Sequence, residues 1–240
     1  MADEIETRVN DRFTSPLFVG MRFVAQRLML KPLVWSLTRV EVHGKARLRK
    51  LGPSFVVVAN HSSHLDAPLI IGGLPYRHAR YLAAGAAADY FFDVKWRKWL
   101  TALFFNAFPV DRSGRGTGPG MSKRLLALGV PLLIFPQGGR QKIETIDEFK
   151  PGAAALSISS NVPVIPVAIV GASVAMPRGV SWPVRGRKPV AVVFGSPLRA
   201  ERNETTTQFS ERLARTITEL HTSYSQSSGA AAANSGKGRK

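Results

Sequence analysis

The chain has 240 residues, of which 45% are hydrophobic, so it is long enough to bury one substantial core and too apolar to be disordered throughout. It contains no cysteine, which excludes disulfides and thiolate metal sites and is compatible with a reducing compartment. The excess of 33 basic over 16 acidic residues gives a net charge of +17, which favours an anionic partner such as nucleic acid or acidic lipid headgroups.

The N-terminal segment, residues 1–39, is predicted to be helical and amphipathic. Ser15-Pro16 is typical of a helix start, and Arg22 and Gln26 fall on a different face from the apolar side chains. Those apolar residues recur at helical spacing: Leu17, Phe18, Met21, Val24, Ala25 and Leu28. The segment lacks the roughly 18 to 20 uninterrupted apolar residues of a spanning helix. It is expected to lie in a membrane interface, and a second interpretation is a helix packed on the protein's own core.

Residues 40–222 alternate short apolar runs with helical patterns, which predicts an α/β fold with a single mixed sheet covered by helices. Strands are predicted at 54–59, 80–83, 131–136, 162–170 and 190–194, and helices at 66–72, 94–105, 121–128, 152–160 and from 207 to about 224. The rest of the chain, 223–240, is rich in Ala, Ser and Gly and is predicted to be a disordered basic tail.

Three polar segments are found at 60–66, 111–115 and 137–142, and the first and third directly follow predicted strands. Ligands of open α/β sheets usually bind beyond the carboxyl ends of the strands. These three segments are therefore where chemistry is expected.

His61 and Asp66 are the candidate catalytic pair in the first of these segments. A histidine acts as a general base at neutral pH when a carboxylate fixes its tautomer, and a turn between strand and helix lets residues five apart meet. The alternatives are that Asp66 only caps the helix, or that His64 is the base rather than a surface histidine. No Gly-x-Ser-x-Gly elbow accompanies Ser62 and Ser63, and no third ligand makes a zinc site, so no metal is expected.

The motif Asn60-His61-x-x-x-x-Asp66 resembles the first signature block of the glycerolipid acyltransferases, whose best-known members are the 1-acylglycerol-3-phosphate acyltransferases. Further blocks follow in the family's order. They are Phe108-Pro109-Val110-Asp111-Arg112, Ile134-Phe135-Pro136-Gln137-Gly138-Gly139-Arg140, Phe149-Lys150-x-Gly152, Val162-Pro163-Val164-Ile165-Pro166-Val167 and Gly195-Ser196-Pro197. The resemblance covers roughly residues 40–220.

The resemblance implies direct acyl transfer from a thioester to a hydroxyl, with His61 as general base oriented by Asp66 and with no cofactor or metal. Arg112 and Arg140 would hold a phosphate, and Lys142 would add a positive charge.

Gly138 and Gly139 would let backbone N–H groups approach the ligand closely. The third block departs from the family pattern, because Gln137 replaces a glutamate and Gly139 a threonine. Glutamine keeps a carbonyl acceptor but loses the charge, so the identity of the acceptor is less certain than the reaction type.

The expected function is acyl transfer from acyl-CoA or acyl carrier protein to a lysophospholipid, first of all 1-acylglycerol-3-phosphate, giving phosphatidic acid. The expected location is the cytoplasmic face of the cell membrane, with the protein bound peripherally to an anionic surface. The alternative is a non-catalytic, membrane-associated lipid-binding protein of the same fold. Nucleic acid is not expected as a partner, because the chain has no recognition motif and its basic residues are scattered. The sequence does not indicate an oligomeric state.

Overall fold

The computed structural model describes residues 12–87, 103–110, 120–141, 146 and 148–237. Seven strands form one sheet in the order β1-β7-β6-β2-β5-β3-β4. Neighbouring strands are parallel except β6 and β7, so the sheet is mixed, as predicted. The strands are β1 (Arg39–His43), β2 (Val56–Ala59), β3 (Ala83–Ala87), β4 (Phe108–Val110), β5 (Leu132–Ile134), β6 (Val164–Val170) and β7 (Pro189–Phe194).

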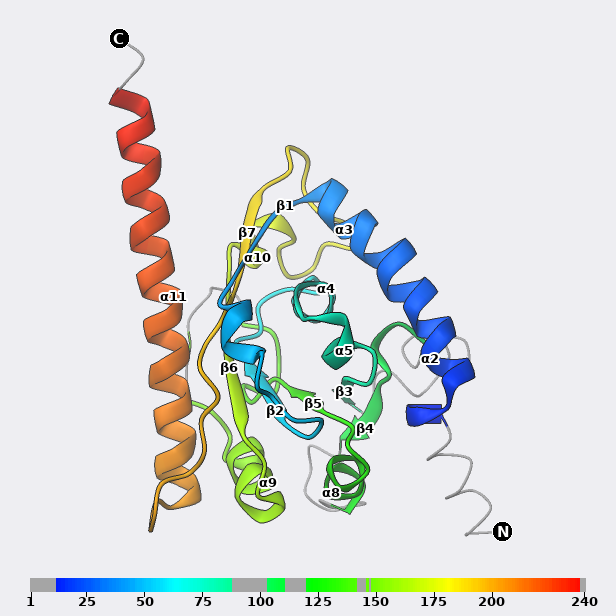
Figure 1. The fold of residues 1–240 in the computed structure, drawn as a ribbon. Helices are drawn as coiled ribbons and strands as arrows, with labels where there is room; N and C mark the ends of the chain where they lie inside the picture. The colour runs from blue at the N-terminus through cyan, green and yellow to red at the C-terminus, as the bar shows by residue number, and fades with distance from the viewer. Residues whose placement is uncertain (1–11, 88–102, 111–119, 142–145, 147, 238–240) are drawn as a thin grey trace.

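Helices cover both faces of the sheet (Figure 1). The central strands are therefore buried on both sides, which explains their continuous apolar sequences. In β2, Val57 and Ala59 face one core cluster and Val56 and Val58 face the other.

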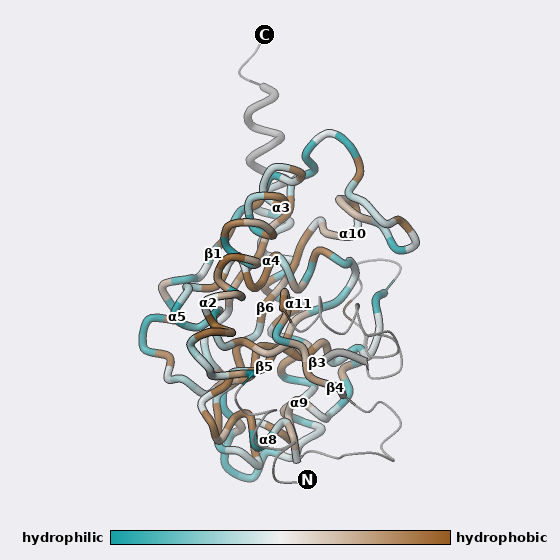
Figure 2. The backbone as a smooth tube through the Cα atoms, turned by 90° about the vertical axis from the view of Figure 1, so that its right-hand side faces the viewer, coloured by the Kyte–Doolittle hydropathy of each residue, from teal (hydrophilic) through white to brown (hydrophobic). Residues whose placement is uncertain are grey.

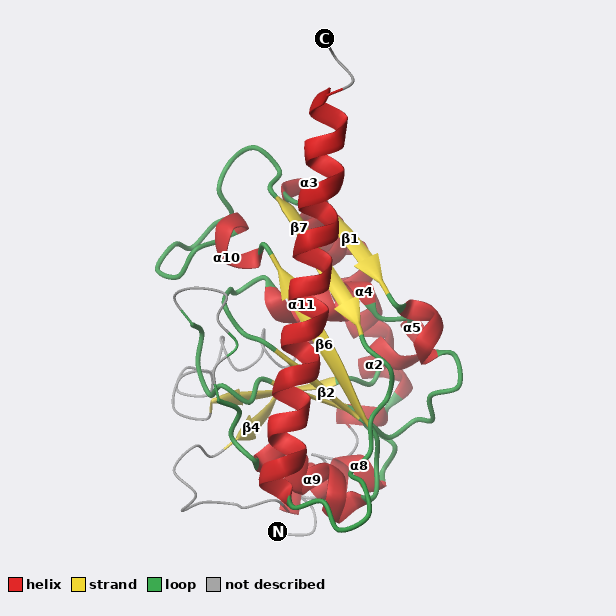
Figure 3. Cartoon of the chain, turned by 90° about the vertical axis from the view of Figure 1, so that its left-hand side faces the viewer, coloured by secondary structure: helices red, strands yellow, loops and turns green. Residues whose placement is uncertain are grey.

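One face carries α4 (Asp66–Gly73) and α5 (Tyr76–Ala79), together with the helical segment at residues 16–37. The other carries α11 (Thr206–Lys237), which crosses the sheet in front of β6 and β7 (Figure 3). The remaining helices are η2 (Lys45–Leu48), α8 (Gly120–Ala127), α9 (Gly152–Ser160) and α10 (Ala172–Ala175).

The C-terminal helix is longer than predicted. α11 continues through Lys237, whereas the sequence analysis expected a disordered tail from 223. The run of four alanines at 230–233 accounts for the difference, because alanine has the highest intrinsic helix propensity. The predicted helix at 94–105 lies mainly outside the described residues, and β1, β4, η2, α5 and α10 were not predicted.

The N-terminal segment forms one continuous helical rod composed of α2 (Pro16–Phe23), η1 (Val24–Leu30) and α3 (Lys31–Leu37). We call these residues the N-terminal helix. Pro16 is its first residue, as predicted, although the Ser15 side chain makes no capping bond. Pro32 does not break it. The middle part has the wide π geometry, in which the Lys31 N–H donates to the Gln26 carbonyl five residues earlier.

The polar side of the N-terminal helix faces the protein. Arg22 is 1% exposed and donates to the carbonyls of Arg12 and Phe13 at 2.8 Å and to the Asn106 side chain at 3.1 Å. Burial, and then the charge of Arg12, lowers the Arg22 pKa to about 10. Gln26 donates to the Phe104 carbonyl at 2.8 Å.

Eight large apolar side chains of the N-terminal helix are exposed, whereas Val34 is buried and Leu30 and Trp35 pack against the core. Figure 2 shows this helix on the near side of the molecule with apolar residues along its length. The exposed set is Leu17, Phe18, Met21, Phe23, Val24, Leu28, Met29 and Leu33, which we call the apolar face. The helix therefore packs on the protein mainly through other residues, although the Phe23 ring also contacts that of Tyr76, with centroids 5.1 Å apart. Among the described residues, no helix is long and apolar enough to cross a bilayer.

Candidate active site

His61 and Asp66 meet in the turn between β2 and α4. The His61 Nδ1 lies 2.8 Å from the Asp66 Oδ2. The aspartate side chain is fully buried, whereas the histidine side chain is 21% exposed. A ring held by one nitrogen and open at the other is the arrangement of a general base.

The Asp66 carboxylate is itself fixed by the turn. Its Oδ2 also accepts hydrogen bonds from the backbone N–H groups of Ser62 and Ser63, at 2.7 and 2.8 Å. α4 begins at Asp66, so the carboxylate turns back toward residues that precede the helix. The role of Asp66 is thus not only to start α4, which was the alternative left open by the spacing.

Asn60 connects this turn to the neighbouring strand. Its side-chain amide donates to the Ile169 carbonyl at 2.9 Å and accepts from the Ile169 N–H at 2.8 Å. Ser63 makes a further link, from its hydroxyl to the Met176 carbonyl at 2.9 Å. These three bonds join the end of β2 to the end of β6 and the helix after it. We call residues 60–66, which hold the candidate catalytic pair, the catalytic turn. It is part of a hydrogen-bonded network rather than a free loop.

The segment after β5 encloses His61 from the other side. The His61 N–H donates to the Gln137 Oε1 at 2.8 Å, and the His61 carbonyl accepts from the Gln141 N–H at 2.8 Å. The Phe135 ring stacks on the imidazole with centroids 4.1 Å apart and 19° between the planes. The first and third predicted segments thus meet at the carboxyl ends of adjacent parallel strands, as expected.

The other polar residues of the turn have different environments. His64 is exposed, and no hydrogen bond of its ring is found in the described part of the chain. Partial burial, followed by the charges of Arg140 and His61, lowers the His64 pKa. Ser62 and Ser63 are buried, and the Ser63 hydroxyl is engaged by a backbone carbonyl. The geometry favours His61 over His64 as the base and gives no support to a serine nucleophile.

Basic groups gather beside the 137–141 segment. The Arg140 Nη1 is buried without a hydrogen-bond partner, and no carboxylate pairs with this guanidinium within the described residues. A Cβ built on Gly138 would lie 3.1 Å from the Lys150 Nζ, so this ammonium lies directly against the turn. Gly138 also has a φ of +72°, which strongly favours glycine. Arg140 and Lys150 together suit an anionic ligand.

Lys150 was not predicted as a site residue. Its block, Phe149-Lys150-x-Gly152, indicated only the start of the next helix, but its backbone N–H donates to the Pro136 carbonyl at 3.1 Å and so joins it to the turn. Of the other predicted residues, Gly139 has open space where a side chain would be. Arg112 and Lys142 lie outside the described residues.

A family model described as Acyltransferase matches residues 39–170, more than half of the chain. The chain belongs to the acyltransferase family. The matched range includes the catalytic turn, the 137–141 segment and Lys150, so the site assembled above lies within the family's shared core.

Several curated proteins resemble this chain. It is 28% identical over 157 residues to a 1-acyl-sn-glycerol-3-phosphate acyltransferase of Chlamydomonas reinhardtii, a match covering 65% of this chain and 46% of that protein. It is 31% identical over 138 residues to the alpha form from Mus musculus, covering 54% and 44% respectively. The chain spans about half the length of the curated relatives it matches.

A solved structure supports the fold of this chain. The 1-acyl-sn-glycerophosphate (LPA) acyltransferase PlsC from Thermotoga maritima superimposes with a TM-score of 0.66 at 21% identity. The match covers 90% of this chain and 87% of that one. The predicted α/β architecture and the family resemblance are confirmed.

Gln137 provides a first test of this candidate site. A Gln137→Leu variant leaves the His61 N–H without its acceptor, and displacement of a catalytic group by about 1 Å can lower the rate about a hundredfold. We expect kcat to fall about ten- to a hundredfold. Gln137→Glu keeps an oxygen acceptor at the same place and should stay close to the parent. Steady-state release of free thiol measures kcat for both variants. Equal losses of kcat in the two would contradict a hydrogen-bonding role for Gln137.

Proposed function

We propose that this chain transfers a fatty acyl group from acyl-CoA or acyl carrier protein to the free hydroxyl of a lysophospholipid, with 1-acylglycerol-3-phosphate as the first candidate acceptor. The observation that carries the proposal is the 2.8 Å contact between the His61 Nδ1 and the buried Asp66 carboxylate. This contact uses Nδ1 and leaves Nε2 of the partly exposed His61 side chain for the reaction.

The proposed reaction is one direct transfer. The His61 Nε2 removes the proton from the acceptor hydroxyl as that oxygen attacks the thioester carbonyl. The C–O bond forms, the C–S bond breaks, and the proton on Nε2 passes to the leaving thiolate. Asp66 keeps the Nδ1–H in place and stabilises the imidazolium formed in between. No acyl-enzyme, metal or cofactor is needed, and their absence from the reaction stays a prediction.

We propose an acceptor with a phosphate group because two cations lie beside the catalytic turn. Arg140 has a buried N–H without a partner, and the Lys150 ammonium lies against Gly138. Guanidinium groups bind phosphate oxygens in bidentate geometry, while an ammonium acts as a point charge. Arg112 and Lys142 stay proposed phosphate ligands on the family resemblance.

The proposed location is the surface of an anionic membrane, on its cytoplasmic face. The apolar face of the N-terminal helix would lie among the lipids, since contiguous exposed apolar residues commonly mark membrane or protein contacts. Its inner face is already occupied by bonds to the protein. The catalytic turn would then meet a lipid acceptor without extracting it far from the bilayer.

A non-catalytic lipid-binding protein of the same fold is the alternative, and the loss of the family glutamate at Gln137 is the observation that favours it. However, the Gln137 carbonyl retains a hydrogen bond to the His61 backbone. Both members of the proposed catalytic pair are also present and in contact. We therefore prefer the enzyme.

A panel of lysophospholipid acceptors with one acyl-CoA tests the proposal. We expect thiol release that depends on acceptor, is greatest with 1-acylglycerol-3-phosphate, and yields a diacyl product identified by mass. An acceptor with a neutral headgroup should react more slowly, because it offers less charge to Arg140 and Lys150. Thiol release no greater than that of a His61→Ala variant with every acceptor would favour the lipid-binding alternative.

A further inference from the structure

The loop between α10 and β7, residues 176–188, has a fixed base and an exposed tip. We call these residues the tryptophan loop. At its base, Ala175 is fully buried in the core, and its carbonyl accepts a hydrogen bond from the Val184 N–H at 2.9 Å. At its tip, Trp182 is 59% and Val180 40% exposed, and the loop stands out from the body of the molecule beside α10 (Figure 3). The exposed tryptophan is thus carried by a loop that is anchored independently of it.

The charge of the tryptophan loop is entirely positive. The sequence has no aspartate or glutamate from residue 149 to residue 200. The loop itself contains the cations Arg178, Arg185, Arg187 and Lys188. Tryptophan is enriched at membrane interfaces because its ring is apolar and its N–H is polar, and cations near an anionic bilayer are attracted to its headgroups. An exposed tryptophan flanked by cations therefore suits the surface of an anionic membrane.

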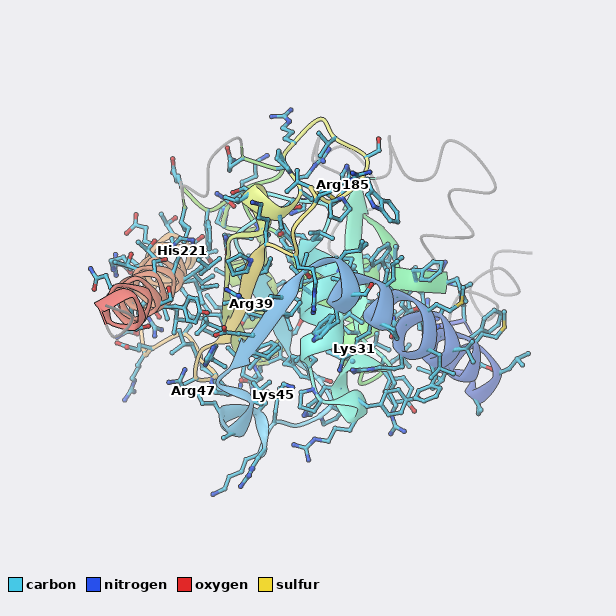
Figure 4. The ribbon with its side chains drawn as sticks, turned by 90° about the horizontal axis from the view of Figure 1, so that it is seen from above. Lys31, Arg39, Lys45, Arg47, Arg185 and His221 are labelled. Atoms are coloured by element: carbon cyan, nitrogen blue, oxygen red, sulfur yellow. The ribbon has the colours of Figure 1, made fainter. Side chains whose placement is uncertain are left out.

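The tryptophan loop is attached to the N-terminal helix. The Arg187 Nη2 donates to the Trp35 carbonyl at 3.1 Å, in the last turn of α3, where carbonyls lack partners within the helix. Leu33, the last residue of the apolar face, lies two positions before Trp35. Seen from above, Arg185 lies beside the end of α3 that leads into β1 (Figure 4). The loop therefore continues the surface that the apolar face begins.

The tryptophan loop also adjoins the candidate active site. Its first residue, Met176, accepts the hydrogen bond from the Ser63 hydroxyl of the catalytic turn at 2.9 Å. The Arg178 Nη1 lies 3.4 Å from the Arg140 carbonyl. The loop thus extends from the end of the N-terminal helix to the catalytic turn, so its position relative to a bilayer determines how the site faces the lipid.

We infer that the tryptophan loop is a second membrane contact, with the Trp182 ring in the interface of an anionic bilayer and the arginines of the loop among its headgroups. The inference rests on the proposed membrane location. A protein held by one helix can still roll about the axis of that helix, and a second contact beside the helix prevents this. The loop would therefore fix the orientation of the catalytic turn toward the lipid. An acidic protein would suit the same charges, but the bond from Arg187 to the helix that carries the apolar face favours the bilayer.

Tryptophan emission on vesicles tests this inference. The full chain is mixed with vesicles of phosphatidylglycerol and phosphatidylcholine, with and without bromine on the acyl chains, which quenches a nearby indole. The chain has four tryptophans, so the spectrum of a Trp182→Phe variant is subtracted from that of the parent. We expect the remaining Trp182 emission to shift to shorter wavelength and to be quenched by the brominated lipid.

Two outcomes of the emission experiment would overturn the inference. Trp182 emission that neither shifts nor is quenched, on a chain that floats with the vesicles, would remove the loop contact and leave the membrane location standing. A chain that does not float would remove both. The vesicles hold neither acceptor nor donor, so the result does not depend on the proposed acyl transfer. A shift on adding acyl carrier protein, with none on adding vesicles, would assign the loop to a protein donor instead.

Flotation measures how much the aromatic tip contributes. A Trp182→Gln variant should bind the anionic vesicles about tenfold more weakly, which corresponds to about 1.4 kcal/mol. Trp182→Phe keeps an apolar ring and should lose less than about threefold. The matched control is Leu128→Gln, at a position that follows α8 and is 47% exposed, and it should bind like the parent. Equal losses in Trp182→Gln and Leu128→Gln would show that any exposed apolar side chain has this effect.

An Arg185→Gln variant tests the charge of the loop. Arg185 is exposed, so its replacement changes the charge and little else. Binding to vesicles containing phosphatidylglycerol should weaken about fivefold, from about 1 kcal/mol per basic residue near anionic lipid. Binding to pure phosphatidylcholine vesicles should be unchanged. Arg202→Gln removes the same charge from an exposed site before α11 and should bind like the parent, and equal losses in the two variants would show that only total charge matters.

Discussion

A His61→Ala variant is expected to lose acyl transfer, with kcat lower by about a thousandfold. The reason is that its ring is the group positioned to take a proton, held 2.8 Å from the buried Asp66. The KM for the acceptor should change little, because the proposed phosphate ligands are other residues. Free thiol release with 1-acylglycerol-3-phosphate and acyl-CoA measures both constants.

His64→Ala is the matched control for this variant. His64 is three residues away and exposed, so its removal should change kcat by no more than about twofold, in keeping with surface substitutions. A large loss with His64→Ala and a small one with His61→Ala would show that His64, and not His61, is the base. Comparable losses in both would indicate that the whole turn had shifted, and thermal unfolding of each variant would reveal this.

The contact between His61 and Asp66 was predictable because its geometry is local. A strand, a five-residue spacing and a helix start are enough to bring His61 and Asp66 together, and they do so here. The surroundings of the ring were not predictable in this way. Phe135 and Gln137 reach His61 only because β5 lies next to β2, a pairing between residues more than seventy positions apart. The position of Lys150 against Gly138 depends on the same long-range arrangement.

The N-terminal helix illustrates another limit of sequence patterns. Helical spacing separated Arg22 and Gln26 from the apolar residues, but it did not show which side faces the protein. The structure favours the polar side because donors there meet backbone carbonyls that need partners. Arg27, for example, donates to the carbonyls of Gly72 and Leu74 at 3.2 and 3.0 Å, at the C-terminal end of α4. The last carbonyls of a helix have no partners within it.

Replacing two residues of the apolar face is expected to detach the protein from membranes. Leu17 is 69% and Leu28 61% exposed, so Leu17→Gln/Leu28→Gln removes apolar surface that makes little contact with the protein. At about 1.5 kcal/mol for each side chain inserted into lipid, vesicle partitioning should weaken about a hundredfold. This loss should appear with neutral and anionic vesicles alike. Flotation at several lipid concentrations gives the partition coefficient.

The matched control is Leu128→Gln/Ile158→Gln, at two exposed apolar positions after α8 and within α9. Both variants should unfold at nearly the parent's temperature, since exposed substitutions change stability by about 0.5 kcal/mol or less. If the control lost as much binding, adhesion would be a general property of apolar surface. If the Leu17/Leu28 variant unfolded early instead, those side chains would be packing against the protein. A hundredfold loss confined to that variant requires a bilayer to contact the N-terminal helix on the side opposite Arg22 and Gln26.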